Sequence, residues 1–119
     1  MSFAESFEDL KVWQRARTLT NAIYNTMRAC KDYAFRDQIQ RAATSVMNNI
    51  SEGFERRTKK DFAHFLDLAK GSAGEVRSML YLAEDRIYVA AKAAEPLRAD
   101  YKELSKSIGA LAASLRRAQ

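Results

Sequence analysis

RAATSVMNNISEGF, residues 41–54, is the stretch that decides the fold. Placed on a helix at about 100° per residue, its apolar side chains share one arc, which predicts a helix packed on a core. That arc contains Ile39, Ala42, Ala43, Val46, Met47, Ile50, Gly53 and Phe54. A polar row borders the arc and contains Gln38, Arg41, Ser45, Asn48, Asn49 and Glu52. Such a row is either exposed to solvent or paired with a neighbouring helix.

The rest of the chain has the same helical character. Its 119 residues include only four glycines and one proline, and no period-2 runs bounded by turn residues are present. A chain of this length fits one domain with one core. We therefore predict an all-α protein, with residues 1–119 forming a single domain that is more than 70% helical.

Four segments with helical periodicity, at about 7–29, 35–57, 59–89 and 96–117, predict an up-down-up-down antiparallel four-helix bundle. Thr58 is expected to cap the third helix, with Asp61 at its third position, and Pro96 suits the first turn of the fourth. Tyr24 falls on the apolar arc of the first helix and Ile87 on that of the third. The predicted core contains Trp13, Val46, Ile50, Phe62, Phe65, Leu80, Leu104, Ile108 and Leu111.

Four residues fall outside the predicted core faces and are candidates for contact with another subunit. Phe7 and Leu10 point well away from the apolar arc of the first helix, so they either contact another subunit or cover the helix end locally. Gly71 and Gly74 fall on the outer face of the third helix, where each costs about 1 kcal/mol of helix propensity relative to Ala. Close approach by another backbone would offset that cost.

The polar row has an expected partner on the third helix. Glu75 lies beside the core stripe there as Arg41 does on the second helix, so antiparallel packing would bring them together. We expect an Arg41–Glu75 pair within a partly buried network, and its loss would cost about 3–5 kcal/mol. The full network contains Arg41, Ser45, Asn49, Glu52, Ser72 and Glu75. The alternative is a solvated face.

Catalytic chemistry is not indicated. His64, the one histidine, lies off the core stripe, and Cys30, the one cysteine, has no CxxC partner. No glycine-rich phosphate loop is present. We expect no enzyme activity, metal, cofactor or small-molecule substrate.

The location of the protein is expected to be cytoplasmic. A single cysteine cannot form an internal disulfide, and the opening residues do not have the pattern of a signal peptide. No apolar run approaches the roughly 20 residues that cross a bilayer, so we expect no membrane association.

Three runs resemble a known family. QIQRAATSVMNNISEGF (residues 38–54), DFAHFLDLAKGSAGEV (61–76) and FEDLKVWQRA (7–16) are similar to the four-helix-bundle proteins encoded in intervening sequences of bacterial 23S ribosomal RNA genes. The resemblance implies a four-helix bundle assembled as a ring, a homopentamer. It also implies kinship with the accessory proteins of diversity-generating retroelements, which bind nucleic acid. It implies no catalytic activity.

Basic residues give the remaining functional indication. The chain has a net charge of +5, and residues 1–60 carry eleven basic and seven acidic side chains. The densest cluster is Arg56, Arg57, Lys59 and Lys60, between the second and third helices, and Lys11 and Arg15 lie one turn apart on the first helix.

Charge at a turn often serves only solubility. A ring would instead repeat the cluster on one rim, which favours an oligomer that binds RNA or DNA. The alternative is a protein-binding scaffold or adaptor without nucleic-acid binding.

Overall fold

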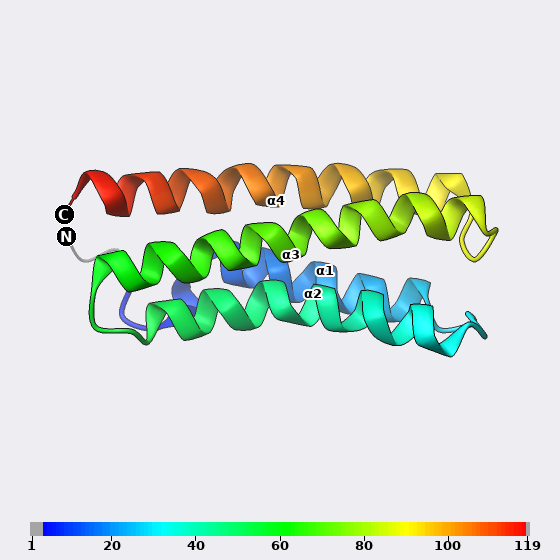
Figure 1. Ribbon diagram of the computed structural model, residues 1–119, viewed down its shortest axis with the longest axis horizontal. Coiled ribbons are helices and arrows are strands. Elements are labelled where there is room, and N and C mark those ends of the chain that lie inside the picture. The colour runs from blue at the N-terminus through cyan, green and yellow to red at the C-terminus, as the bar shows by residue number, and fades with distance from the viewer. Residues whose placement is uncertain (1–3, 119) are drawn as a thin grey trace.

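The computed structural model describes residues 4–118, which form an antiparallel bundle of four α-helices (Figure 1). The elements are a 3-10 helix η1 (Phe7–Asp9) and the helices α1 (Lys11–Thr26), α2 (Tyr33–Phe54), α3 (Lys59–Asp85) and α4 (Ala91–Arg117). Helix makes up 83% of the structure, and residues 4–118 contain no strand. The predicted all-α four-helix bundle is confirmed.

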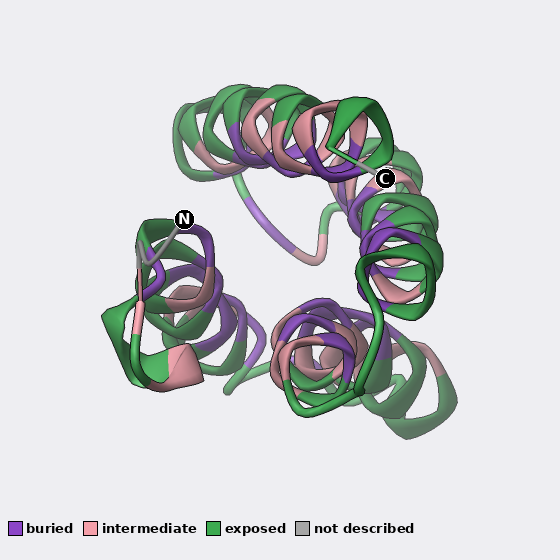
Figure 2. Ribbon diagram, turned by 90° about the vertical axis from the view of Figure 1, so that its left-hand side faces the viewer, coloured by how far each residue is buried: buried purple, intermediate pink, exposed green. Residues whose placement is uncertain are grey.

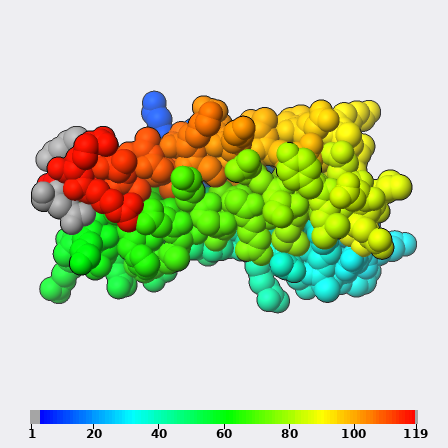
Figure 3. All heavy atoms as spheres, turned by 45° about the horizontal axis from the view of Figure 1, so that its top comes forward, coloured from blue at the N-terminus to red at the C-terminus, as the bar shows by residue number. Residues whose placement is uncertain are grey.

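The bundle is a rod of 46 × 19 × 19 Å. Viewed along its axis, the helices surround the core in chain order, and the buried residues face inward (Figure 2). The contacts of α3 with α2 and α4 are extensive, whereas α1 contacts α4 much less. The space-filling view shows α3 and α4 packed side by side along one face (Figure 3).

The core is built from small and branched apolar side chains of all four helices. Six of the nine predicted core residues are buried: Val46, Ile50, Phe62, Leu80, Leu104 and Ile108. Trp13, Phe65 and Leu111 are only half-buried, so they flank the core instead of filling it.

The start of α1 differs from the prediction because residues 7–10 are not α-helical. The Asp9 carboxylate accepts a hydrogen bond from the Ser6 backbone N–H at 3.3 Å, as their spacing suggests, but the turn it closes is η1. Leu10 then adopts an extended conformation and is 5% exposed, and Phe7 packs edge-on against Trp13 with 5.0 Å between ring centroids. Helical angles do not apply to this segment. Its expected role in contacting another subunit is therefore wrong for Leu10, and Phe7 covers the bundle end locally.

The turn between α2 and α3 is held by the predicted cap. The Thr58 hydroxyl accepts a hydrogen bond from the Asp61 backbone N–H at 3.0 Å, at the first turn of α3. The preceding helix ends at Phe54, so residues 55–58 form the connection. An extended backbone at Thr58 then redirects the chain.

Gly53 lets α2 and α3 approach each other closely beside this turn. A Cβ atom added at Gly53 would lie 2.6 Å from Phe65 Cβ and 3.0 Å from Phe62 Cδ1. The first distance is shorter than Cβ contacts in proteins, so a side chain at this position would force α2 and α3 apart. The sequence had indicated only that Gly53 lies on the core arc.

The end of α3 contains an unusual residue. The helix ends at Asp85, followed by a Schellman motif in which Ile87 N–H bonds to Glu84 O and Tyr88 N–H bonds to Ala83 O. Ile87 therefore has a φ of 60°, in the left-handed region, and its side chain is 88% exposed. Its predicted place on the core stripe is wrong because α3 stops before it.

The fourth helix begins earlier than predicted, at Ala91, so Pro96 lies inside it. The alanine-rich start has high helix propensity, which offsets the hydrogen bond that the proline ring cannot donate.

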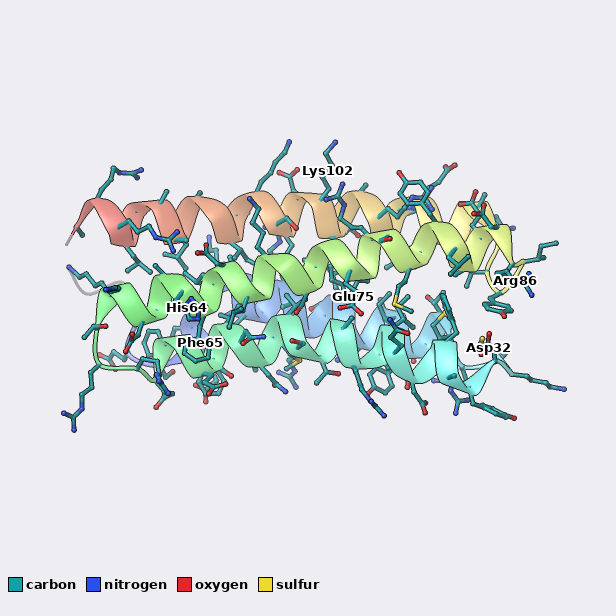
Figure 4. All side chains as sticks on the ribbon, in the orientation of Figure 1. Asp32, His64, Phe65, Glu75, Arg86 and Lys102 are labelled. Atoms are coloured by element: carbon teal, nitrogen blue, oxygen red, sulfur yellow. The ribbon has the colours of Figure 1, made fainter. Side chains whose placement is uncertain are left out.

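The two connections at this end of the bundle are tied together. The Tyr88 hydroxyl donates a hydrogen bond of 2.6 Å to Asp32 Oδ2, and Asp32 Oδ1 caps α2 by accepting from Phe35 N–H. These two donors lower the pKa of Asp32, and the Asp32 carboxylate raises the pKa of Tyr88. Asp32 and Arg86 both lie at this end (Figure 4).

Three polar side chains are buried between the helices. The Thr20 hydroxyl donates to the carbonyl oxygens of Ala16 and Ala43, whereas the Tyr101 hydroxyl and Ser105 Oγ make no hydrogen bond to any described residue. Burial raises the pKa of Tyr101 far above its ordinary value, with a smaller opposing effect from the nearby Thr20 hydroxyl. Tyr101 therefore stays neutral at physiological pH.

Candidate functional site

The antiparallel topology brings the α2–α3 connection to the same end of the bundle as the start of α1 and the end of α4 (Figure 1). The four basic residues of this connection and of the first turn of α3 are here called the basic turn: Arg56, Arg57, Lys59 and Lys60. All four side chains are exposed. The basic turn is thus an open surface at one end of a rod.

The cations of the basic turn form no ion pairs with the described residues of the protomer. The ion pairs among residues 4–118 are Arg98–Glu84 and Arg116–Asp67, so none of the four cations is paired. The guanidinium of Arg56 stacks over the Phe65 ring, with its Cζ 5.0 Å from the ring centroid. That contact holds the Arg56 stem without neutralising its charge.

Acidic side chains limit the extent of the positive surface. Glu55 and Asp61 lie within the same segment, and Glu8 and Asp9 precede α1 at this end. Four cations against two carboxylates still leave residues 55–61 positive. The excess is therefore concentrated at the basic turn and does not cover the whole end.

The other candidate cations have different surroundings. Lys11 is exposed at the first residue of α1, at the same end as the basic turn. Arg15 instead donates a hydrogen bond of 3.1 Å to Ser107 on α4, in a hollow between α1 and α4 that Asp100 also lines. Arg15 therefore belongs to a different surface.

The polar row meets α3, but only in part. Ser45 Oγ and Ser72 Oγ are 2.9 Å apart, and the Asn49 amide nitrogen donates to both the hydroxyl and the carbonyl oxygen of Ser45. All three side chains are half-buried. These contacts form a small hydrogen-bonded cluster between α2 and α3.

The expected Arg41–Glu75 pair is wrong for the protomer. Glu75, which lies on the side of α3 that faces α2 (Figure 4), accepts a hydrogen bond of 3.3 Å from Gln38 instead. On a helix, Gln38 and Asn49 lie on the α3 side of Ser45, whereas Arg41 lies on the opposite side. Arg41 is consequently exposed, as is Glu52.

Arg41 and Glu52 instead line a surface hollow, here called the α1–α2 hollow, of about 450 Å³. Its lining residues are Tyr24, Arg41, Thr44, Ser45, Asn48, Asn49 and Glu52. Tyr24, predicted to lie on the core arc of α1, is 46% exposed and faces this hollow. Nothing in the single sequence distinguishes Tyr24 from the core residues beside it, because it lies at the edge of the arc.

The outer face of α3 is partly apolar, and beside α4 it contains a surface hollow of about 470 Å³ lined by Asp67, Lys70, Gly71, Gly74, Arg77 and Ser105. A Cβ atom added at Gly71 or Gly74 would have no neighbour within 4 Å among residues 4–118, so no other described helix approaches either glycine closely. Leu68 and Leu82 lie on the same face and are 44% and 47% exposed. At helical spacing, residues 68, 71, 75, 78 and 82 form one exposed stripe.

The two residues considered for catalysis are isolated. His64 is exposed and packs edge-on against Phe65, and Cys30 is buried, with its Sγ 3.7 Å from the Asp32 carbonyl oxygen. Within residues 4–118, no three His, Cys, Asp or Glu side chains are grouped closely enough to hold a metal ion. None of the described helices is both long enough and apolar enough to span a membrane.

Comparison with known proteins identifies the family. The family model described as "23S rRNA-intervening sequence protein" matches residues 8–110. The chain belongs to the family of 23S rRNA-intervening sequence proteins. A solved structure from Bacteroides thetaiotaomicron, described as a protein with unknown function from the S23 ribosomal protein family, is similar to this chain. It is 25% identical, with a TM-score of 0.76 over 82% of this chain and 94% of that one. The comparison with curated proteins returned no match.

Membership of the 23S rRNA-intervening sequence protein family agrees with the resemblance inferred from the three sequence runs. The match begins at Glu8 and ends at Ala110, so it includes α1, α2, α3 and most of α4. The basic turn, the α1–α2 hollow and the outer face of α3 all lie within the matched region.

Proposed function

We propose that this chain is a non-enzymatic, self-associating bundle that binds RNA or DNA through the basic turn. The observation that carries the proposal is the set of four exposed cations at one turn, none of them paired with a carboxylate of residues 4–118. Unpaired surface Lys and Arg bind the phosphate backbone, and their affinity depends on how many contacts form together. No base-reading motif accompanies the cluster, so binding through it should depend little on sequence.

Self-association supplies the number of contacts that a single turn lacks. The exposed stripe on α3, with Leu68, Leu82 and the uncovered Gly71, is the surface proposed to contact a second copy. A head-to-tail contact that closes into a ring would place one basic turn from each copy on the same rim. In a homopentamer the rim would carry about twenty cations, since each copy contributes four.

The binding test uses two variants with the same change in charge. In the first, the four residues of the basic turn are replaced by Ala; in the second, Arg28, Lys31, Arg86 and Lys92 at the opposite end are replaced. We expect fluorescence anisotropy at low salt to show a loss of RNA and DNA binding only in the first variant. Equal losses of binding in the two variants would mean that binding depends on the net charge of the protein and not on the basic turn. No binding by the wild-type protein would refute the nucleic-acid proposal.

The assembly test uses light scattering. Leu68→Glu combined with Leu82→Glu should convert the oligomer to a 13.5 kDa monomer, because two carboxylates would be buried in the contact. Ala99→Glu combined with Ala110→Glu places the same charges on exposed positions of α4 and should leave the assembly unchanged. A monomeric wild-type protein at micromolar concentration would refute self-association. An oligomer that binds no nucleic acid would favour the scaffold alternative.

A further inference from the structure

The α1–α2 hollow has a chemistry that the basic turn does not have. It combines one exposed aromatic ring, amide side chains, a cation and a carboxylate on two adjacent helices. We infer that the α1–α2 hollow takes one unpaired base of a single-stranded nucleic acid. This inference rests on the proposed function, because it identifies the form of nucleic acid that the protein would take.

Tyr24 provides the stacking surface. Among residues 4–118 its ring makes no aromatic pair and no cation–π contact, and its hydroxyl has no hydrogen-bond partner. By contrast, the other exposed tyrosines are covered on one face: Arg36 lies over Tyr33 and Arg98 over Tyr81. A base stacks on a free aromatic face regardless of its identity.

The amide of Asn49 is oriented by its hydrogen bonds. A backbone carbonyl only accepts, so the bond of 2.9 Å to Ser45 O fixes the amide nitrogen beside Ser45. Asn49 Oδ1, which accepts no hydrogen bond from residues 4–118, is therefore left as an acceptor at the hollow. Glu52, exposed and without an ion pair to any described residue, adds a carboxylate acceptor one turn away.

These two acceptors favour bases that present an exocyclic amino group. Adenine, cytosine and guanine carry such a donor, whereas uracil and thymine present carbonyl oxygens flanking a single ring N–H. The carbonyl oxygens of uracil or thymine would be repelled by the side-chain oxygens of Asn49 and Glu52. The hollow is thus expected to discriminate against uracil and thymine.

Arg41 and Asn48 complete the site. Asn48 is exposed and its side-chain amide makes no hydrogen bond to the part of the chain that the structure describes, so it can donate to or accept from a base edge. Arg41 lies seven residues from Asn48, about 10 Å along the helix axis, and has no carboxylate partner within residues 4–118. It is placed to contact a phosphate of the strand whose base occupies the hollow. A base within a duplex is already stacked and paired, so only single strands can fill the site.

The experiment measures anisotropy with fluorescein-labelled dA, dC and dT oligonucleotides of equal length and with a duplex. We expect the wild-type protein to bind dA and dC more tightly than dT. Tyr24→Ala should weaken dA binding about tenfold and leave duplex binding unchanged, whereas Tyr24→Phe should bind as the wild type does. Tyr33→Ala, which removes an exposed tyrosine at the start of α2 that does not line the hollow, is the matched control and should have no effect.

Glu52→Gln provides a second variant that cannot disturb the core, because Glu52 is exposed. It should reduce the difference in affinity between the dA and dT oligonucleotides, since an amide can donate a hydrogen bond to a thymine carbonyl. If Tyr24→Ala binds dA as Tyr33→Ala does, or if the wild type prefers dT, the inference is overturned while binding through the basic turn stands. If the wild type binds no nucleic acid at all, the proposed function fails and the inference fails with it. If Tyr24→Ala changes the mass of the assembly, the hollow is an interface between copies and the inference is overturned.

Discussion

Replacing Ile87 with Gly should stabilise the protein. Ile87 closes a complete Schellman motif with a φ of 60°, a conformation that costs an L-residue about 1–2 kcal/mol. Its side chain is 88% exposed, so removing it loses almost no buried apolar surface. The unfolded chain gains freedom from the added glycine, which offsets about 0.4–1 kcal/mol of the benefit. The net increase in the free energy of unfolding should be about 0.5–1 kcal/mol.

Urea melts at a protein concentration held constant would measure this change, and thermal melts should show a rise in Tm of about 2–5 °C. Ile87→Ala is the control, because it removes the same side chain but keeps a Cβ in the left-handed region. It should differ little from the wild type. A loss of stability in Ile87→Gly would refute the reasoning, since it would mean that the isoleucine side chain is buried against something, as in an assembly.

Three further changes test other features of the bundle. Gly53→Ala should destabilise the protein by about 1–2 kcal/mol in urea melts because its Cβ would collide with α3, and an unchanged or increased free energy of unfolding would contradict the packing. Tyr101→Phe should change the free energy of unfolding by less than about 1 kcal/mol, because its hydroxyl has no partner, and a larger loss would reveal one. Asp32→Asn should be less stable than the wild type at neutral pH. The folded-state pKa of Asp32 is depressed, so its contribution is present above the unfolded pKa of 3.8 and is lost as the pH falls through the folded value. Melts over this pH range should therefore converge, and a constant difference would exclude the carboxylate as the cause.

The fold could be predicted because the apolar residues of each helix recur at helical spacing within its own segment of sequence. The Thr58 cap was predictable for the same reason, since a cap depends only on neighbouring residues. The errors fall where local chain geometry departs from a helix. Leu10 follows a 3-10 turn and Ile87 follows a helix end, so helical angles misplace both side chains.

The candidate sites were less predictable because they depend on contacts between helices. The sequence predicted that Arg41 and Glu75 lie on facing flanks of α2 and α3. Which polar residue of α2 contacts Glu75 depends on how the two helices are rotated and aligned, and in the structure that residue is Gln38. Gly53 illustrates the same limit, since only the structure shows how closely α3 approaches it. The basic turn could be predicted from the sequence because its four cations lie within five consecutive residues, so no tertiary contact is needed to bring them together.

The most direct test of the central claim is the salt dependence of single-stranded RNA binding by the wild type and by the variant with Ala at all four positions of the basic turn. Each phosphate contact contributes about 0.7 to the slope of log affinity against log salt concentration. The slope of the variant should therefore be shallower than that of the wild type by about 3 per basic turn engaged, with the helical content of the two proteins unchanged. Identical slopes would show that the RNA does not contact the basic turn and would contradict the proposed function.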